Sequence, residues 1–172
     1  VRAIAEARIK TDKIDSETLA QLLRADLIPE AYAPSREVRS TKRVLRQRMF
    51  LVRVRTMVKN RIRALLAQHA VSWPDVSDLY EKAGREWLDG LSLPDPDGRL
   101  LKEDLGLLDF LKDRIRATEG LIRELSEGDE AVKWLGSIPG IGAFFSVLIR
   151  YEVDDIGRFR EAKKFASYTG LV

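Results

Sequence analysis

Hydrophobic residues between Arg36 and His69 recur with a period of seven, which is the pattern of a helix with one apolar stripe. Two neighbouring series follow this period: Val44, Leu51, Val58 and Leu65, and beside them Val38, Leu45, Val52 and Leu66. The segment contains no glycine and no proline, so nothing in it interrupts a helix. We therefore predict a rod of roughly 50 Å, at 1.5 Å per residue, that buries its apolar stripe against a partner helix.

A second long helix is predicted from Leu101 to Leu125. Its apolar face consists of positions three or four residues apart: Leu101, Leu105, Leu108, Leu111, Ile115, Thr118, Ile122 and Leu125. The connector over residues 70–98 is long enough to let this helix return antiparallel to the rod. The expected result is a long, coiled-coil-like helical hairpin whose apolar faces bury either each other or a second copy of the chain.

Shorter helices are predicted on both sides of the hairpin and in its connector. A short helical pattern covers residues 1–9, and another helix begins near Lys10, ends near Asp26 and is followed by Pro29 and Pro34. Ser35 can cap the rod, and the aromatic residues of the connector predict short packed helices. We favour a core role for these aromatics over a base-stacking platform, because basic residues do not interleave with them densely. After the hairpin, helices are predicted over 129–136, 143–149 and 161–169. The fold class is thus mainly α, in three parts: 1–34, 35–127 and 128–172.

The third part contains the sequence Pro139, Gly140, Ile141, Gly142 between two predicted helices, which is typical of a helix-hairpin-helix. We expect Leu135 and Ile138 to pack before this turn, and the two glycines to allow a close backbone approach. Backbone amides at Gly140, Ile141 and Gly142 could then hold a phosphate at the start of the next helix. An ordinary turn between packed helices remains the alternative, because no Lys or Arg follows Gly142 within three positions.

Charge along the chain is concentrated on the rod. Residues 36–69 contain eleven Lys or Arg and one acid, Glu37, a net of +10, which leaves −7 on the rest of a chain whose total is +3. Because this helix offers almost no acid for pairing, contact with a polyanion is favoured over a solvated face. The candidate nucleic-acid contacts, with Asn60 among them, are Arg39, Lys42, Arg43, Arg46, Arg53, Arg55, Lys59, Asn60, Arg61 and Arg63.

Two carboxylates, Asp12 and Asp15, lie three residues apart in the first turn of the second predicted helix. They could be oxygen ligands of Mg²⁺ beside a phosphodiester. The alternative is helix capping, with Asp12 accepting from the first-turn amides. From spacing alone, capping is the commoner arrangement. The single histidine, His69, has no second histidine to complete a metal site, and we interpret it as incidental.

Composition excludes several classes of protein. No cysteine is present, so there is no disulfide framework and no Cys-based zinc site. No apolar run is long enough for a membrane span, so a cytoplasmic protein without a membrane partner is expected. The sequence starts at Val1 without a methionine and stops at Val172 just after a helical pattern, which suggests an internal fragment.

Several blocks, taken in order, resemble the DEDD transposases of bacterial insertion sequences, the "one-ten" family. These blocks are Lys10 to Ser16, Arg55 to Leu66, Ile138 to Gly142 and Phe159 to Leu171. The resemblance covers nearly the whole chain, and the order of the blocks matches throughout. Each block alone is modest evidence, but together they are specific.

The resemblance implies a RuvC-like nuclease domain, a helical coiled-coil segment and a C-terminal transposase domain, with some members guided by a structured RNA. It implies that Asp12 and Asp15 are the last two of four acids that bind Mg²⁺, which replaces capping as the expected role. Residues 1–34 would be the last helices of the nuclease domain. Residues 35–127 would serve homo-oligomerisation and nucleic-acid contact, and 128–172 would begin the transposase domain.

The resemblance also implies what this chain lacks. The first two acids of the family would lie before Val1 and its catalytic serine after Val172, so the chain alone should neither cut nor join DNA. The sequence therefore indicates a bacterial DNA transposase, inactive as this fragment, that uses strand cleavage and exchange. Two non-enzymatic alternatives stay open: a helical nucleic-acid-binding module, and a purely structural dimerisation coiled coil.

Overall fold

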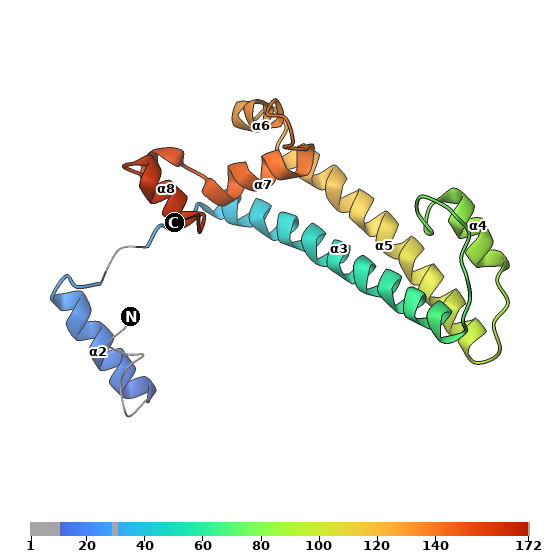
Figure 1. The fold of residues 1–172 in the computed structure, drawn as a ribbon. Helices are drawn as coiled ribbons and strands as arrows, with labels where there is room; N and C mark the ends of the chain where they lie inside the picture. Colours follow the sequence, from blue (N-terminus) through green and yellow to red (C-terminus); the bar gives the residue numbers. More distant parts are fainter. Residues whose placement is uncertain (1–10, 29–30, 172) are drawn as a thin grey trace. The chain divides into compact units, whose positions relative to one another are not determined.

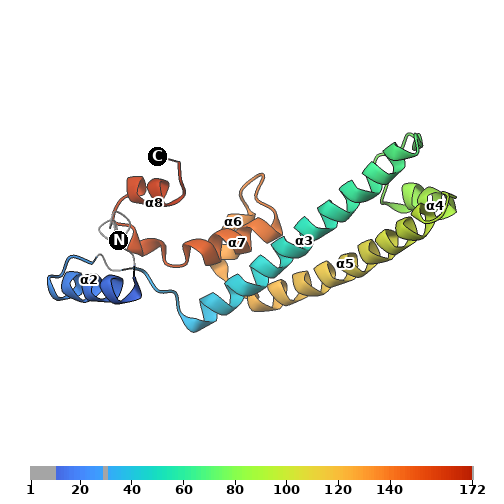
Figure 2. The ribbon, with the colours of Figure 1, turned by 90° about the horizontal axis from the view of Figure 1, so that it is seen from below.

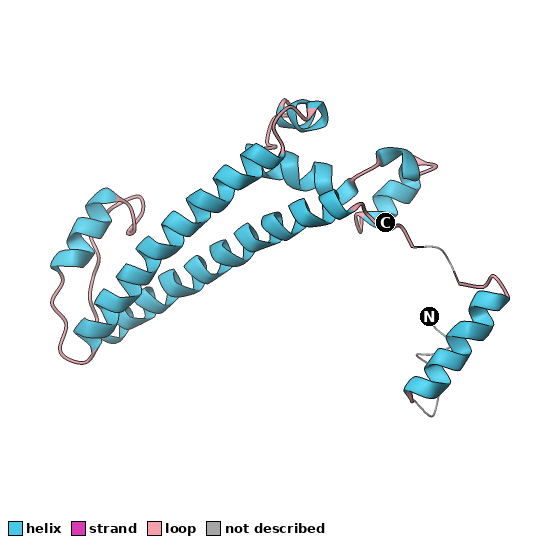
Figure 3. Ribbon diagram, turned by 180° about the vertical axis from the view of Figure 1, so that it is seen from behind, coloured by secondary structure: helices cyan, strands magenta, loops and turns pink. Residues whose placement is uncertain are grey.

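The computed structural model describes residues 11–28 and 31–171. Within these residues it contains seven α-helices, one short 3-10 helix and no strand (Figure 3). This confirms the mainly α class. Contacts divide the chain into two units, one up to Pro34 and one from Ser35 onwards. The hairpin and the residues after 127 thus belong to one unit, while the assignment of these parts to nuclease and transposase domains stays a prediction.

The first unit contains helix α2, Asp12–Arg24. Its cap is Thr11, whose side-chain oxygen accepts a hydrogen bond from the backbone N–H of Ile14 at 3.3 Å. No residue of α2 is buried within this structure. The short helix predicted over residues 1–9 lies outside the described residues.

The predicted rod is helix α3, Arg36–Gln68, and it is continuous over 33 residues. Ser35 caps it as expected, because its side-chain oxygen accepts from the backbone N–H of Val38 at 3.2 Å. His69 is its C-cap. The absence of glycine and proline, together with the apolar stripe, accounts for this length.

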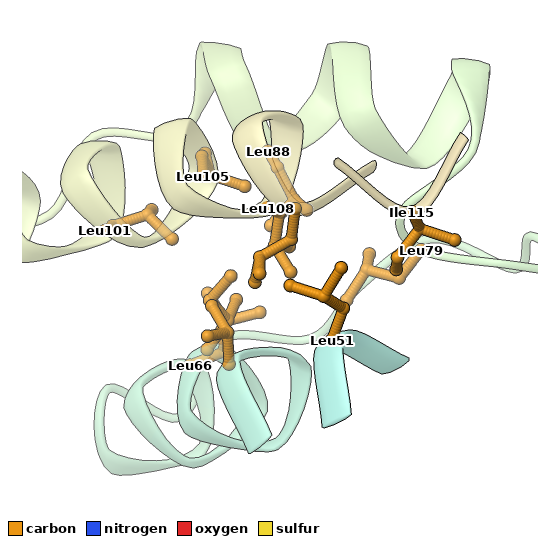
Figure 4. Close-up of a cluster of buried hydrophobic side chains, with 11 residues drawn as sticks. Leu51, Leu66, Leu79, Leu88, Leu101, Leu105, Leu108 and Ile115 are labelled. Atoms are coloured by element: carbon orange, nitrogen blue, oxygen red, sulfur yellow. The ribbon is translucent and has the colours of Figure 1, made fainter. Parts of the chain in front are cut away.

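Helix α5, Asp97–Leu125, returns antiparallel along α3, and the two helices lie side by side in both views (Figures 1 and 2). Their facing side chains form one buried cluster (Figure 4). Ile62 and Leu66 of α3 are fully buried in it, and Leu101 of α5 is almost so. The predicted apolar faces therefore bury each other within one chain.

The connector contributes one short helix, α4, Lys82–Gly90. Leu79 and Leu88 insert into the α3–α5 cluster and are 5% and 1% exposed. Gly84 lies directly over the backbone at Leu79, where an added Cβ would fall 2.4 Å from the carbonyl oxygen. The connector is therefore packed onto the tip of the hairpin, with Trp87 partly buried there as the sequence predicts.

Four short elements follow the hairpin: α6 (Glu130–Gly136), α7 (Ala143–Val153), the 3-10 helix η1 (Ile156–Arg158) and α8 (Ala162–Tyr168). Helices α6 and α7 pack on each other, and α7 also packs on α3. A second buried cluster, formed by Leu45, Ile122 and Val147, joins α3, α5 and α7.

Two details of the predicted helix-hairpin-helix are wrong. Ile138 is 48% exposed and therefore does not pack before the turn. An added Cβ at Gly140 or Gly142 would meet no atom within 4 Å, so neither glycine serves a close backbone approach. Gly140 is instead required by its φ of 92°, which side chains disfavour, and Gly142 is the N-cap of α7.

Candidate functional site

The carboxylates Asp12 and Asp15 lie in the first turn of α2, where Asp12 is exposed and Asp15 half-buried. The cap of this helix is Thr11, so the capping role that we considered for Asp12 is wrong. Asp15 donates its backbone N–H to the Thr11 carbonyl at 2.9 Å, and among the described residues neither carboxylate takes part in a hydrogen bond or an ion pair. Both side chains thus remain available as ligands.

These two carboxylates do not form a metal site by themselves. Mg²⁺ requires near-octahedral oxygen coordination, and the described residues contain no group of three or more His, Cys, Asp or Glu side chains that could hold a metal ion. The pair can supply two carboxylate ligands of a shared site.

The cations of α3 form three overlapping groups, which share Arg46 and Lys59, and the first group consists of cations that pair with acids. Five of them form ion pairs with acids that other segments bring to α3: Lys42 and Arg46 with Glu152, Arg48 with Glu119, Lys59 with Asp78, and Arg61 with Asp104. The sequence did not show this pairing, because the acids lie 19 to 110 positions away along the chain.

Lys42 is the clearest departure among the predicted contacts. Its side chain is only 11% exposed, with the ammonium 3.2 Å from the Glu152 carboxylate and donating to the Glu152 carbonyl at 3.3 Å. Lys42 therefore joins α3 to α7 and does not face a ligand. Arg48, which we did not single out, has a related role: it donates to Glu119 at 2.7 Å and stacks 4.1 Å over the Phe144 ring.

The second group is an exposed row of side chains at seven-residue spacing, which we call the arginine stripe: Arg39, Arg46 and Arg53. All three are exposed, and Asn60 continues the row one heptad further. Arg46 keeps 66% of its side chain exposed despite its pairing with Glu152. Positions seven apart lie on one face of a helix, so the stripe presents three guanidinium groups in one direction. Arg43, also exposed, donates to the Ser40 hydroxyl at 3.1 Å.

The third group is the row of cations four residues apart, Arg55, Lys59 and Arg63, over which the connector lies. Lys59 and Arg63 stand 4.5 Å and 5.7 Å from the centre of the Tyr80 ring. The Tyr80 hydroxyl donates to the Lys59 carbonyl at 2.6 Å, and burial raises the pKa of this phenol. The Asp78 carboxylate accepts a hydrogen bond from the backbone N–H of Tyr80 and pairs with the Lys59 ammonium. Both interactions lower the pKa of Asp78.

A pocket of about 260 Å³ opens beside this row, between α3, α4 and α5. Three cations line it that the sequence did not reveal as candidates, Lys82, Arg85 and Lys112. They were hidden because acids alternate with them along the sequence, so no charge run marks them. The packing of α4 and α5 with α3 brings them beside Arg55 and Lys59.

At the predicted helix-hairpin-helix, Gly140, Ile141 and Gly142 form the turn that leads into α7. The Ile141 N–H is used within the turn, since it donates to the Ile138 carbonyl at 3.0 Å. Gly142 has no side chain that could cap α7, so no side chain of the N-cap residue accepts a hydrogen bond from the first amides of that helix. Phosphate binding at this turn stays a prediction.

Over the residues that the structure describes, the chain is all-helical, and a cationic hairpin follows one helical segment and precedes another along the sequence. Comparison with known sequences gives the family. A transposase profile of the DEDD class matches residues 1–71, and a profile described as "Transposase IS116/IS110/IS902 family" matches residues 132–172. The chain belongs to the IS110 family of transposases, as the order of its blocks predicted.

A curated relative is similar over almost the entire chain. It is a "Probable family 20 transposase" of Pseudomonas aeruginosa, 29% identical over 170 residues, which are 95% of this chain and 50% of the relative. The chain thus spans about half the length of the relative that it matches. None of the helices in the described ranges has the length and apolar character that crossing a membrane requires.

Proposed function

We propose that this chain acts within a DNA transposase that cleaves and exchanges strands with Mg²⁺, and that its α3 helix holds nucleic-acid phosphates. The observation that carries the proposal is the arginine stripe, Arg39, Arg46 and Arg53. Three exposed guanidinium groups on one face of one helix form a track of positive charge. Such groups contact the backbone without reading sequence, and their affinity falls with salt.

The metal role of Asp12 and Asp15 rests on family membership and on their position in the first turn of α2, where Asp12 is exposed and Asp15 half-buried. Because they supply only two carboxylates, we propose that they complete a site with acids from the rest of the protein. Mg²⁺ bound there would polarise a phosphodiester and activate its attacking group. Asp12 and Asp15 would only hold and orient the ion.

A test of this role is Asp12→Asn with Asp15→Asn in the full-length protein. We expect loss of transposition with unchanged helix content, because the amides keep the shape but not the charge. Glu17→Gln, an exposed acid later in α2, is the matched control and should retain activity. Transposition retained by the Asp12, Asp15 double variant would contradict the metal role.

Homo-oligomerisation through the hairpin is supported by apolar side chains that the fold leaves outside. Phe50 and Met57, seven residues apart on α3, are 58% and 62% exposed, and Leu107 and Leu121 on α5 are 41% and 42% exposed. Residues at this spacing share a face and could meet a second copy. A double variant, Phe50→Glu with Met57→Glu, tests this when its oligomeric state is compared with that of the parent chain by sedimentation. The variant should be monomeric at concentrations where the parent associates.

The non-enzymatic alternatives make different predictions. A nucleic-acid-binding module would keep its salt-dependent binding when Asp12 and Asp15 are replaced and would have no cleavage to lose. A purely structural coiled coil would bind neither DNA nor a structured RNA at any salt concentration. Titration with both nucleic acids therefore separates these alternatives and tests a guide RNA as partner.

A further inference from the structure

The connector places aromatic side chains among cations of α3, although the two groups are separate in the sequence. Arg55, Lys59 and Arg63 lie four residues apart, on one face of the helix. Two pockets flank this face and share Lys59: the first of about 260 Å³, and a second of about 250 Å³ lined by Trp73. Cations interleaved with aromatics are the pattern of single-strand binding surfaces.

Some cations of this surface are not neutralised. Lys59 pairs with Asp78, and Arg85 is held by Asp89 and Asp109. In the part of the chain that the structure describes, by contrast, no ion pair engages Arg55 or Lys82, which remain as charges for a ligand, whereas Arg63 lies 5.7 Å from the centre of the Tyr80 ring. The surface thus contains cations that are held in ion pairs and cations that are not.

Trp73 supplies the aromatic group. It lines the second pocket beside Lys59 and Arg63 and is 49% exposed. A core tryptophan of this hairpin, by comparison, packs against the buried cluster as Trp87 does. Trp73 therefore offers ring surface to a flat partner next to two cations.

We propose that this surface, which we call the connector site (Arg55, Arg63, Trp73 and Lys82), binds single-stranded nucleic acid. An unpaired base stacks on Trp73, and the cations hold the neighbouring phosphates. Duplex is not the ligand, because its bases are stacked on each other and unavailable to an aromatic ring. The inference rests on the proposed nucleic-acid function but uses residues other than the arginine stripe.

The test is fluorescence anisotropy of the whole chain with labelled oligo-dT, oligo-U and a duplex of equal length. Trp73→Ala should weaken single-strand binding by about tenfold, the effect of losing one stacked base, and Arg55→Gln with Lys82→Gln should weaken it further. Duplex affinity should stay unchanged in Trp73→Ala. Trp134→Ala, which removes a ring 75% exposed on α6, is the matched control and should leave both affinities unchanged.

The outcomes separate this inference from the function on which it rests. Single-strand affinity that is unchanged in Trp73→Ala and in the Arg55, Lys82 variant overturns the connector site. If Arg39→Gln with Arg53→Gln still weakens duplex binding, the proposed function survives that failure. Absence of binding to every nucleic acid overturns both. Equal affinity for oligo-dT and oligo-U would show that the site binds bases and phosphates and does not distinguish the sugars. Tighter binding of oligo-U would identify single-stranded RNA as the ligand.

Discussion

Lys42 is a buried cation of α3 whose charge is paired with a carboxylate of α7. Within the rod it is one more cation at an expected contact position, but the fold buries it against Glu152, 110 positions further along the chain. A buried charge is tolerated only when it is paired. The pair therefore fixes α7 against α3.

Removing the carboxylate should cost more than removing the lysine. Glu152→Ala leaves the Lys42 ammonium buried with only a carbonyl partner, so we expect about 1–3 kcal/mol less free energy of unfolding. Lys42→Met removes the charge and should cost less. Arg46→Ala, which loses a pair with the same carboxylate from a 66% exposed side chain, is the control and should cost under about 1 kcal/mol. Urea denaturation measures all three, and equal costs would contradict the role of Lys42.

Two glycines give opposite predictions for the same substitution. Gly84→Ala drives a methyl group into the Leu79 backbone at 2.4 Å, and should destabilise the chain by about 1–3 kcal/mol. Gly106→Ala lies in the middle of α5 with nothing within 4 Å, and should stabilise by about 0.5–1 kcal/mol. Thermal unfolding followed by circular dichroism compares them. A stabilising Gly84→Ala would show that α4 does not pack as described.

At the scale of single residues, the sequence predicts those features that depend on local spacing. The Ser35 cap follows from its position before a periodic segment, and the structure confirms it. The partners of Lys42, Arg48 and Arg61 could not be predicted, because they depend on how the return helix and α7 dock. For the same reason the connector site escaped prediction, since Trp73 and Arg63 meet only in space.

At the scale of elements, α3 and α5 stabilise each other through a continuous apolar seam. Ile62 lies fully buried in it, while Met57, five positions earlier, is 62% exposed. Ile62→Ala should lower the free energy of unfolding by about 2–5 kcal/mol, from lost burial and a residual cavity. Met57→Ala should change it by less than about 0.5 kcal/mol. Chemical denaturation gives both values, and similar losses would place the seam elsewhere.

Heptad periodicity predicts most of the seam in both helices, but not all of it: Ile62 is fully buried and belongs to neither predicted series of α3, and Leu125 of the predicted α5 face is 40% exposed. The connector was less predictable: short helices carry few periodic positions, and α4 is held by Leu79 and Leu88 rather than by its own propensity. The helix-hairpin-helix was right in its helices but wrong in its glycine roles, which depend on backbone angles that composition does not reveal.

The connector also carries a pH dependence. Because the lowered pKa of Asp78 belongs to the folded state, the charged carboxylate contributes stability above its ordinary pKa of 3.8, and this contribution disappears as pH falls below that value. Asp78→Asn should therefore be less stable than the parent at neutral pH and approach it in acid. Urea titrations across this range measure the difference, and a constant difference would contradict the pairing with Tyr80 and Lys59.

At the scale of the whole molecule, stability resides in the unit that starts at Ser35. Every buried hydrophobic side chain among the described residues belongs to this unit, and α2 buries none. A chain that starts at Ser35 should keep the helical hairpin and the urea midpoint of the parent. A lower midpoint would show that residues before Ser35 stabilise the hairpin.

The central claim is that the arginine stripe holds nucleic-acid phosphates, and one titration tests it most directly: duplex DNA binding by anisotropy over a range of salt. The logarithm of affinity should fall linearly with the logarithm of salt, and Arg39→Gln, Arg46→Gln, Arg53→Gln should reduce the slope by about 3. The control with equal charge loss on α5, Arg99→Gln, Lys102→Gln, Arg116→Gln, should keep the parent slope. A flat response, or equal losses in both variants, would contradict the account.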